Sequence, residues 1–370
     1  MIIYSKEYFG LALLLRCAGS PVIRALPYPV LCTLLTVWLS VQSSSNDTLE
    51  NDLVHPYPYQ VFAFVLGFVL VFRTNFAYQR YMEGRSNIQQ MASKWADAVV
   101  QALSFEKHLD RSTNCTEEMR FFRNQLLHCA SLLHAVSLQH LRTDNSLDNL
   151  EIHDPGSSSA ANNSRKTKSW SKTNPLRYTL GFSYYARDRT LELCRHSPLG
   201  VIGGVTAAER SVLGTETEKT HVIYTWMHQI LSEYYREGGM QVPPPVFSRI
   251  FQVLSDGMLG FMQAKKLTDT PYPFPHAQMV FLLLLIFCFT LPFVMVSKVT
   301  STWLAAVFTF IASFAYFSVN EVARELEEPW KYDPNEIPCG LLQHEFNERL
   351  LQVGEAARYG MPVFMVGLPL

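Results

Sequence analysis

The sequence predicts an all-α integral membrane protein with four transmembrane helices and a helical region outside the membrane. Hydrophobic residues make up 48% of the 370 residues and charged residues only 17%, whereas a soluble domain has roughly 25% charged residues. The mean hydropathy is nevertheless only +0.04, so the apolar residues must be concentrated in part of the chain. These apolar residues lie in four windows, each close to the length of about 20 residues that a helix needs to cross a bilayer.

The overall charge excludes one large class of proteins. The formal net charge is -1 and the pI is near 6.8, so the chain has no basic field of the kind that binds nucleic acid. The seven cysteines are scattered, and no pair has the spacing of a zinc knuckle or a redox motif. The apolar run in residues 1–15 is short and contains Lys6 and Glu7, so no cleavable signal peptide is expected.

Residues 1–83 are expected to form an N-terminal segment with two spans, Pro21–Val41 and Tyr59–Tyr81. Lysine and arginine precede the first span and follow the second, while all the charges of residues 42–55 are acidic apart from His55. Positive charge near span ends marks the cytosolic side. The N-terminus is therefore expected on the cytosolic (or stromal or matrix) side.

Residues 84–269 are expected to form a helical cytosolic region. Apolar residues recur at three- and four-residue spacing in Met91–Lys107, Glu117–Leu141 and Glu216–Arg236, as they do in amphipathic helices. Residues 143–173 are rich in Ser, Asn and Asp, and this composition predicts a disordered insertion.

Residues 270–320 are expected to hold the third and fourth spans, His276–Ser297 and Ser301–Asn320. Neither span contains Asp, Glu, Lys or Arg, which makes both strong candidates for membrane helices. Residues 321–370 then form a C-terminal cytosolic segment. Both termini are predicted on the same side, although the host membrane is not specified by the sequence.

The second span carries an aromatic stripe. Phe64, Phe68 and Phe72 recur every four residues, so they share one face of a helix. Contact with lipid or with another helix is the general explanation for such a stripe. The alternative is that several copies surround an axis and form a narrow hydrophobic constriction.

The residues that follow the stripe are similar to a known family. The run Phe72–Arg80, continuing to Glu83-Gly84-Arg85, resembles the F-R-x-N-x-x-Y-x-R-W-x-E-x-R run of bacterial and plant bestrophins. Two further anchors keep the order of the family: Arg16–Ser20 is similar to its R-G-S, and Glu328–Pro338 resembles its N-P-F-G-x-D-x-N-D-L-P.

This resemblance implies a ring-shaped homopentamer in the lipid membrane, with the second span lining a central pore. By position, Phe64, Phe68 and Phe72 fall on the pore neck. The implied permeant ion is chloride or another monovalent anion such as bicarbonate or nitrate.

Three arginines, Arg73, Arg80 and Arg85, follow the stripe. They would supply vestibule charge that attracts anions. The alternative is that they are membrane-edge anchors that form ion pairs with Glu83 between subunits.

The resemblance also implies a second constriction in the cytosolic part. It is expected within Val222–Tyr235, which includes Trp226 and Ile230. Calcium is a further candidate ligand, because animal bestrophins bind it with an acidic run after the last span. Here Asp333 and Glu336 are the candidate metal ligands, and residues 334–335 interrupt the run.

Enzyme-like patterns fail, so no catalytic residues are expected. His344–Glu348 begins like a zinc-protease helix but ends in Glu, so the paired-histidine set is missing. His128, His134 and His140 lie six apart, which places them on different helix faces. The function classes that remain are an anion channel, a non-conducting membrane assembly protein of the same fold, and a secondary anion transporter.

Overall fold

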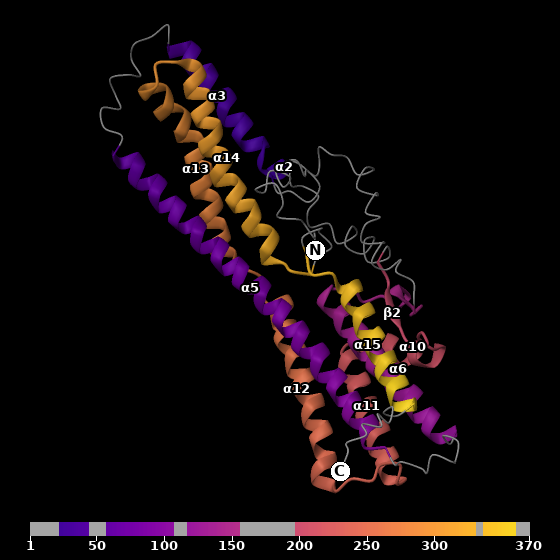
Figure 1. Ribbon diagram of the computed structural model, residues 1–370. Helices are drawn as coiled ribbons and strands as arrows, with labels where there is room; N and C mark the ends of the chain where they lie inside the picture. Colours follow the sequence, from indigo (N-terminus) through magenta and orange to yellow (C-terminus); the bar gives the residue numbers. More distant parts are fainter. Residues whose placement is uncertain (1–21, 44–56, 107–116, 156–196, 331–335, 360–370) are drawn as a thin grey trace, which may run out of the picture. The chain divides into compact units, whose positions relative to one another are not determined.

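A computed structural model describes residues 22–43, 57–106, 117–155, 197–330 and 336–359. The chain divides into two compact units, whose described parts are residues 22–83 with 267–337 (unit 1) and 84–155 with 197–266 and 338–359 (unit 2), within the gaps given above. Helix α5 (Tyr57–Ser104) contributes residues to both units. Figure 1 shows the elements of each unit.

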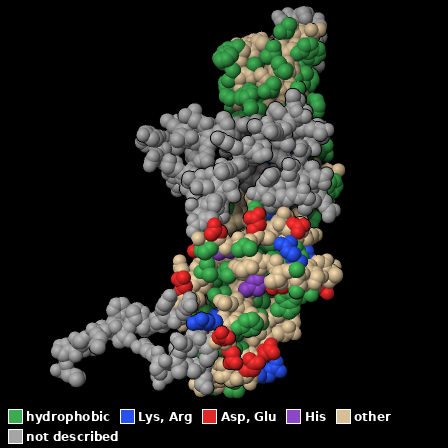
Figure 2. Space-filling model, turned by 90° about the vertical axis from the view of Figure 1, so that its right-hand side faces the viewer, with side chains coloured by type: hydrophobic (Ala, Val, Ile, Leu, Met, Phe, Trp, Pro, Cys, Tyr) green, Lys and Arg blue, Asp and Glu red, His purple; other side chains and the backbone are tan. Residues whose placement is uncertain are grey.

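Unit 1 is a layer of apolar helices. Helices α3 (Pro27–Ser43), α13 (Phe274–Lys298) and α14 (Thr302–Glu327) pack against one another (Figure 1). Their shared core includes residues of α5 and is made of Ala25, Cys32, Leu66, Leu70, Val280, Leu284, Phe287, Leu291 and Phe317. The unit 1 surface in Figure 2 is dominated by hydrophobic side chains, as expected of a surface that contacts lipid.

Three described helices, α5, α13 and α14, are long and apolar enough to cross a membrane. The sequence predicts the first span as one helix, Pro21–Val41, but the structure divides it into α2 (Val22–Ala25) and α3. Pro27 opens α3, and a proline lacks the N–H that would continue the preceding helix. The 17 residues of α3 reach about 26 Å, somewhat less than the hydrocarbon core of about 30 Å.

Unit 2 is built around a buried helix, α6 (Glu117–Leu141), which has the bounds that its periodicity predicts. It packs against α11 (Lys219–Arg236) and α15 (Cys339–Tyr359). Helix α12 (Pro244–Asp269) begins in unit 2, and the short α10 (Ala207–Thr215) lies before α11.

A polar layer joins α6 to α15. Ser131 donates to Asn347 Oδ1 at 2.7 Å, and His134 Nδ1 lies 2.6 Å from Gln343 Oε1. The side-chain amides of Gln343 and Asn347 also donate to the carbonyl oxygen of Gly200 at 2.9 and 2.8 Å. The buried polar groups of this layer therefore bind one another and the neighbouring strand.

The all-α prediction misses a small parallel strand pair in unit 2. Strand β1 (Leu150–Ile152) pairs with β2 (Leu199–Val201), with Leu150 opposite Leu199. Strands of three residues are too short for a period-two pattern to be recognised in the sequence.

The predicted disordered insertion, 143–173, is ordered over its first part. Asp144 is buried and accepts hydrogen bonds from Ser146 N and Asn149 Nδ2, which hold the turn η2 (Leu147–Asn149) before β1. Asp and Asn side chains favour such local backbone turns, so a composition typical of disorder here encodes a turn. Residues 156–173 lie outside the described residues.

Candidate functional site

The exposed face of α5 carries a row of phenylalanine rings. Phe64, Phe68 and Phe72 have exposed fractions of 74%, 55% and 43%. Phe76 continues the row, and the successive ring centroids are 6.3, 4.6 and 6.3 Å apart. Leu66, between the first two rings in sequence, is fully buried in the unit 1 core. One side of α5 is therefore held by packing while the aromatic side is left uncovered.

The sequence prediction missed Phe76. The family resemblance supplies three neck positions, and the prediction kept to these three. The four-residue spacing alone would have found the fourth ring, because Phe76 follows Phe72 by the same step. The aromatic row (Phe64, Phe68, Phe72 and Phe76) is thus longer than expected.

Arg73 does not present a free charge beside the aromatic row. Its side chain is buried, and its Nε donates to Glu327 Oε1 at 2.8 Å while Nη1 donates to Asn320 Oδ1 at 2.6 Å. The guanidinium also lies 5.7 Å from the ring centroid of Tyr272. Because its charge is paired inside unit 1, the geometry does not support the expected role of Arg73 in attracting anions.

Arg80 binds backbone carbonyls rather than a carboxylate. Its Nε donates to the Glu327 carbonyl oxygen at 2.8 Å, and its Nη2 donates to the carbonyl oxygens of Leu267 and, at 2.7 Å, Thr270. Leu267 is in the last turn of α12 and Thr270 directly follows the helix, where the last helix carbonyls lack intrahelical partners and attract a cation. These contacts hold the Arg80 guanidinium on backbone carbonyls of unit 1, and both its vestibule role and the anchor alternative stay predictions.

Arg85 belongs to unit 2. Its side chain is half-buried, and its Nη1 has no hydrogen-bond partner among the residues that the structure describes. Among the three arginines, Arg85 is therefore the one whose surroundings leave a buried donor available.

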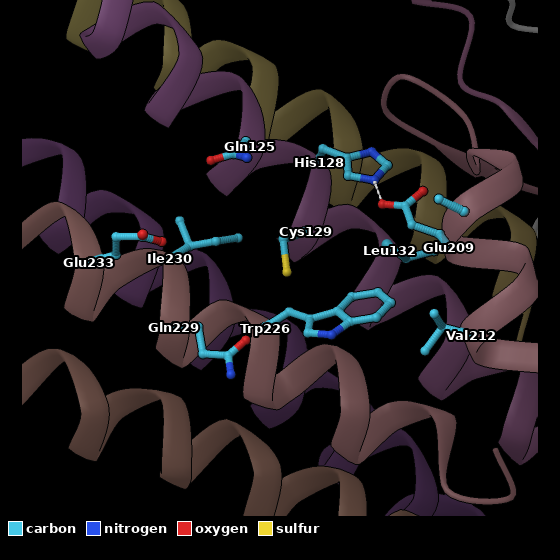
Figure 3. Close-up of a pocket in the computed structure, with 11 residues that line it drawn as sticks. Gln125, His128, Cys129, Leu132, Glu209, Val212, Trp226, Gln229, Ile230 and Glu233 are labelled. Carbon is cyan, nitrogen blue, oxygen red and sulfur yellow. Dashed lines mark hydrogen bonds and ion pairs between the residues drawn. The ribbon is translucent and has the colours of Figure 1, made fainter.

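Unit 2 contains a pocket of about 410 Å³ between α6, α10 and α11 (Figure 3). Trp226 and Ile230, the residues expected at a second constriction, both line it from α11. His128 of α6 lies at the opposite rim, where its Nε2 is 2.7 Å from Glu209 Oε1 (Figure 3). Apolar side chains thus share the pocket with a charged group.

The His128–Glu209 pair is held in place by its neighbours. Nδ1 of His128 lies 2.7 Å from the Ile202 carbonyl oxygen, and since a carbonyl oxygen only accepts, Nδ1 carries the hydrogen. Burial opposes ionisation of Glu209, but hydrogen bonds from Thr206 and His128 outweigh this effect and hold its pKa below the usual value. Glu209 also completes a capping box with Thr206 at the start of α10. The carboxylate is therefore held in place at the pocket rim, paired with His128.

The pocket does not contain a reactive nucleophile among its lining residues. Cys129 lines it, but burial raises the pKa of the Cys129 thiol to about 12. A thiol in this state has almost no thiolate at neutral pH, and the thiolate is the nucleophile.

Of the two candidate calcium ligands, the structure describes only one. Glu336 is buried, whereas Asp333 lies outside the described residues. Within the described ranges, the group of three or more potential metal ligands is a different one, formed by His153, His344 and Glu348.

Comparison with known proteins identifies the family. Residues 1–352 match the family described as Bacterial/Fungal Bestrophin protein. The chain is 30% identical over 89 residues to a voltage-dependent anion channel-forming protein of Nostoc sp. (strain PCC 7120), covering 24% of this chain and 28% of the relative. It is also 30% identical over 86 residues to a protein of the same description from Synechocystis sp. (strain PCC 6803), covering 23% and 27%. The matches span about a quarter of the length of these curated relatives.

Solved structures share the fold at low identity. A bacterial bestrophin homolog from Klebsiella pneumoniae is 15% identical with a TM-score of 0.62, covering 88% of this chain and 98% of that chain. Another structure, described as a membrane protein, is 14% identical with a TM-score of 0.64, covering 90% and 98%. These likenesses and the apolar helices α5, α13 and α14 identify a multi-pass membrane protein. Since the family match covers residues 1–352, the chain belongs to the bestrophin family.

Proposed function

We propose that the chain is an anion channel, assembled as a ring-shaped homopentamer in which α5 lines the pore. The observation that carries this proposal is the aromatic row on a helix that is apolar enough to span a membrane. Copies of this face around a common axis would cover the rings that a single chain leaves exposed. Membership of the family and the channel-forming description of the two cyanobacterial relatives support a channel and not an enzyme.

Phe64, Phe68 and Phe72 form the neck in this proposal, and Phe76 extends it. A narrow apolar passage excludes water when closed, which allows gating by dewetting. Phenyl rings carry a positive edge, and edges turned toward the axis would favour an anion over a cation. Chloride, bicarbonate and nitrate are the proposed permeant anions.

Four spans and a cytosolic location of both termini complete the proposal. Helix α3 would be the fourth and shortest span, packed against α13 and α14. Trp226 and Ile230 would form a second constriction, with the Glu209 charge near them. Calcium binding at Asp333 and Glu336 stays a prediction from the sequence.

The proposal is tested with the full chain reconstituted in planar lipid bilayers. Replacing Phe64, Phe68 and Phe72 together with Ala widens the neck, so we expect loss of gating or a changed permeability ratio between chloride and larger anions. The matched control replaces three exposed phenylalanines of α13, Phe281, Phe289 and Phe293, with Ala. The control should conduct like the natural protein.

The outcomes separate the alternatives. Currents that are identical in the neck variant and the natural chain would refute the neck. Absence of both unitary current and anion flux would favour an assembly protein, and slow, saturable flux without unitary current would favour a secondary transporter. Light scattering of the detergent-solubilised protein adds a second test, because a stable monomer of 42.2 kDa would contradict the ring.

A further inference from the structure

Three potential metal ligands meet at one place in unit 2. His153 comes directly after β1, while His344 and Glu348 lie on α15. One nitrogen of each histidine and one oxygen of the glutamate all lie within 4.8 Å of one another. The cluster joins residues that are about 190 positions apart in the chain, so it is formed only by the folded structure.

Helical spacing explains two of the three ligands. His344 and Glu348 are four residues apart, and side chains at this separation are neighbours on one face of an α-helix. The sequence pattern lacks the second histidine that would normally complete such a helix motif. His153 supplies that histidine from another element, with its Nε2 3.0 Å from Glu348 Oε1 and its ring centroid 5.1 Å from that of His344.

The position of His153 is fixed by its backbone and its surroundings. Its N–H donates to the Val201 carbonyl oxygen at 2.9 Å, which extends the strand pair by one residue. Its side chain is only 4% exposed. A Cβ atom at Gly200 would lie 3.2 Å from His153 Nδ1, so the imidazole packs directly against the glycine of β2.

Helix α15 is fixed against the same strand. Gln343 and Asn347 both donate to the Gly200 carbonyl oxygen, and each directly precedes one of the two ligands on α15. The hydrogen bonds that hold α15 on β2 therefore also hold His344 and Glu348 beside His153. Ligands positioned in advance by their supporting contacts bind a metal with less loss of conformational freedom.

We propose that His153, His344 and Glu348 bind a divalent transition-metal ion of the zinc class. Two imidazoles and one carboxylate suit Zn²⁺, Co²⁺ or Ni²⁺, whereas Ca²⁺ and Mg²⁺ prefer oxygen ligands. Ligands of a tetrahedral ion lie about 3.4 Å apart, given bond lengths near 2.1 Å. The 3.0 Å pair is already close to this spacing, and rotation of the His344 side chain brings in the third ligand.

The partial exposure of the cluster completes the coordination. His344 is half-buried and the Glu348 side chain is 34% exposed, so the ion is reached from solvent and water takes the fourth position. The bound ion would cross-link α15 to the segment that leads from β1 into residues 156–196. A metal at this place therefore stabilises the docking of α15 and offers a point of regulation.

The test uses the full-length protein in detergent after removal of metals with a chelator. Titration with Co²⁺ should give the visible absorption of a tetrahedral site, saturating at one ion per chain, and Zn²⁺ should displace it. His344→Ala and Glu348→Gln should each weaken Co²⁺ binding at least tenfold. Glu348→His keeps three ligands, so it should retain binding with a shifted spectrum, which distinguishes loss of a ligand from loss of the fold.

The matched control is His221→Ala. Nδ1 of His221, on α11, lies 3.5 Å from Oε2 of Glu218, the residue before this helix. This is also a histidine–glutamate pair, but it has no third ligand within the described part of the chain. The control should bind Co²⁺ like the natural protein. A natural chain without the absorption band, or an unchanged Co²⁺ affinity in His344→Ala, would overturn the proposal. Neither result bears on the currents that test the channel.

Discussion

The Arg73–Glu327 pair allows a quantitative test of how unit 1 is held together. The side chains are only 5% and 10% exposed, and the donor and acceptor atoms are 2.8 Å apart. Two unit charges about 4 Å apart attract by about 4 kcal/mol at an effective dielectric constant near 20. Glu327→Gln removes this attraction and leaves the buried guanidinium with Asn320 and the Tyr272 ring. We expect unit 1 to lose about 3 kcal/mol, in line with other broken buried pairs.

The assay is thermal unfolding of the detergent-solubilised protein. A loss of about 3 kcal/mol corresponds to a decrease of about 6–12 °C in melting temperature for a domain of this size class. Glu83→Gln is the control, because it makes the same chemical change at an exposed position of the same unit, where we expect less than about 0.5 kcal/mol. Replacing Arg73 and Glu327 together with Met should restore most of the stability. Equal melting temperatures for Glu327→Gln and Glu83→Gln would show that the pair is not a stabilising contact.

Two further predictions concern unit 2. Burial lowers the pKa of His134 to about 4, below its ordinary value near 6.5. The unfolded chain therefore binds a proton at higher pH than the folded chain does, and stability falls by up to about 3 kcal/mol as pH decreases from about 6.5 to 4. The melting temperature of His134→Asn should depend less on pH across this range, and an unchanged pH dependence would assign the effect to other groups. Gly257→Ala places a Cβ 2.5 Å from Nε1 of the buried Trp95 and should lower the free energy of unfolding by about 1–3 kcal/mol. The control is Gly214→Ala, which has open space within 4 Å and should be neutral or stabilising. Equal melting temperatures for the two variants would contradict the packing argument.

The elements that could be predicted from the sequence are those with a strong local signal. The last two spans are long runs without charge, and α6 has a clear helical period, so both are recognised from neighbouring residues alone. The strand pair β1–β2 gives no such signal, because its strands have three residues each and 46 residues of the chain lie between them. Likewise, the polar residues before β1 look disordered by composition but form a turn around the buried Asp144.

The same distinction applies to the site. The aromatic row follows from helical spacing, which is why three of its rings were expected and the fourth could have been. The partner of Arg73 is Glu327, 254 residues away, and no periodicity connects the two. The histidine that completes the proposed metal site is likewise distant from His344 and Glu348. Contacts of this kind follow from the tertiary fold and are not visible in one sequence.

The polar layer between α6 and α15 fixes the register of the two helices. An apolar interface tolerates a shift of one helix along the other, because one leucine can replace another in the same hole. Here a shift of one residue would separate Ser131 from Asn347 and His134 from Gln343, leaving several buried polar groups without partners, each at a cost of about 1–3 kcal/mol. We therefore expect helix α15 to keep a single register against α6.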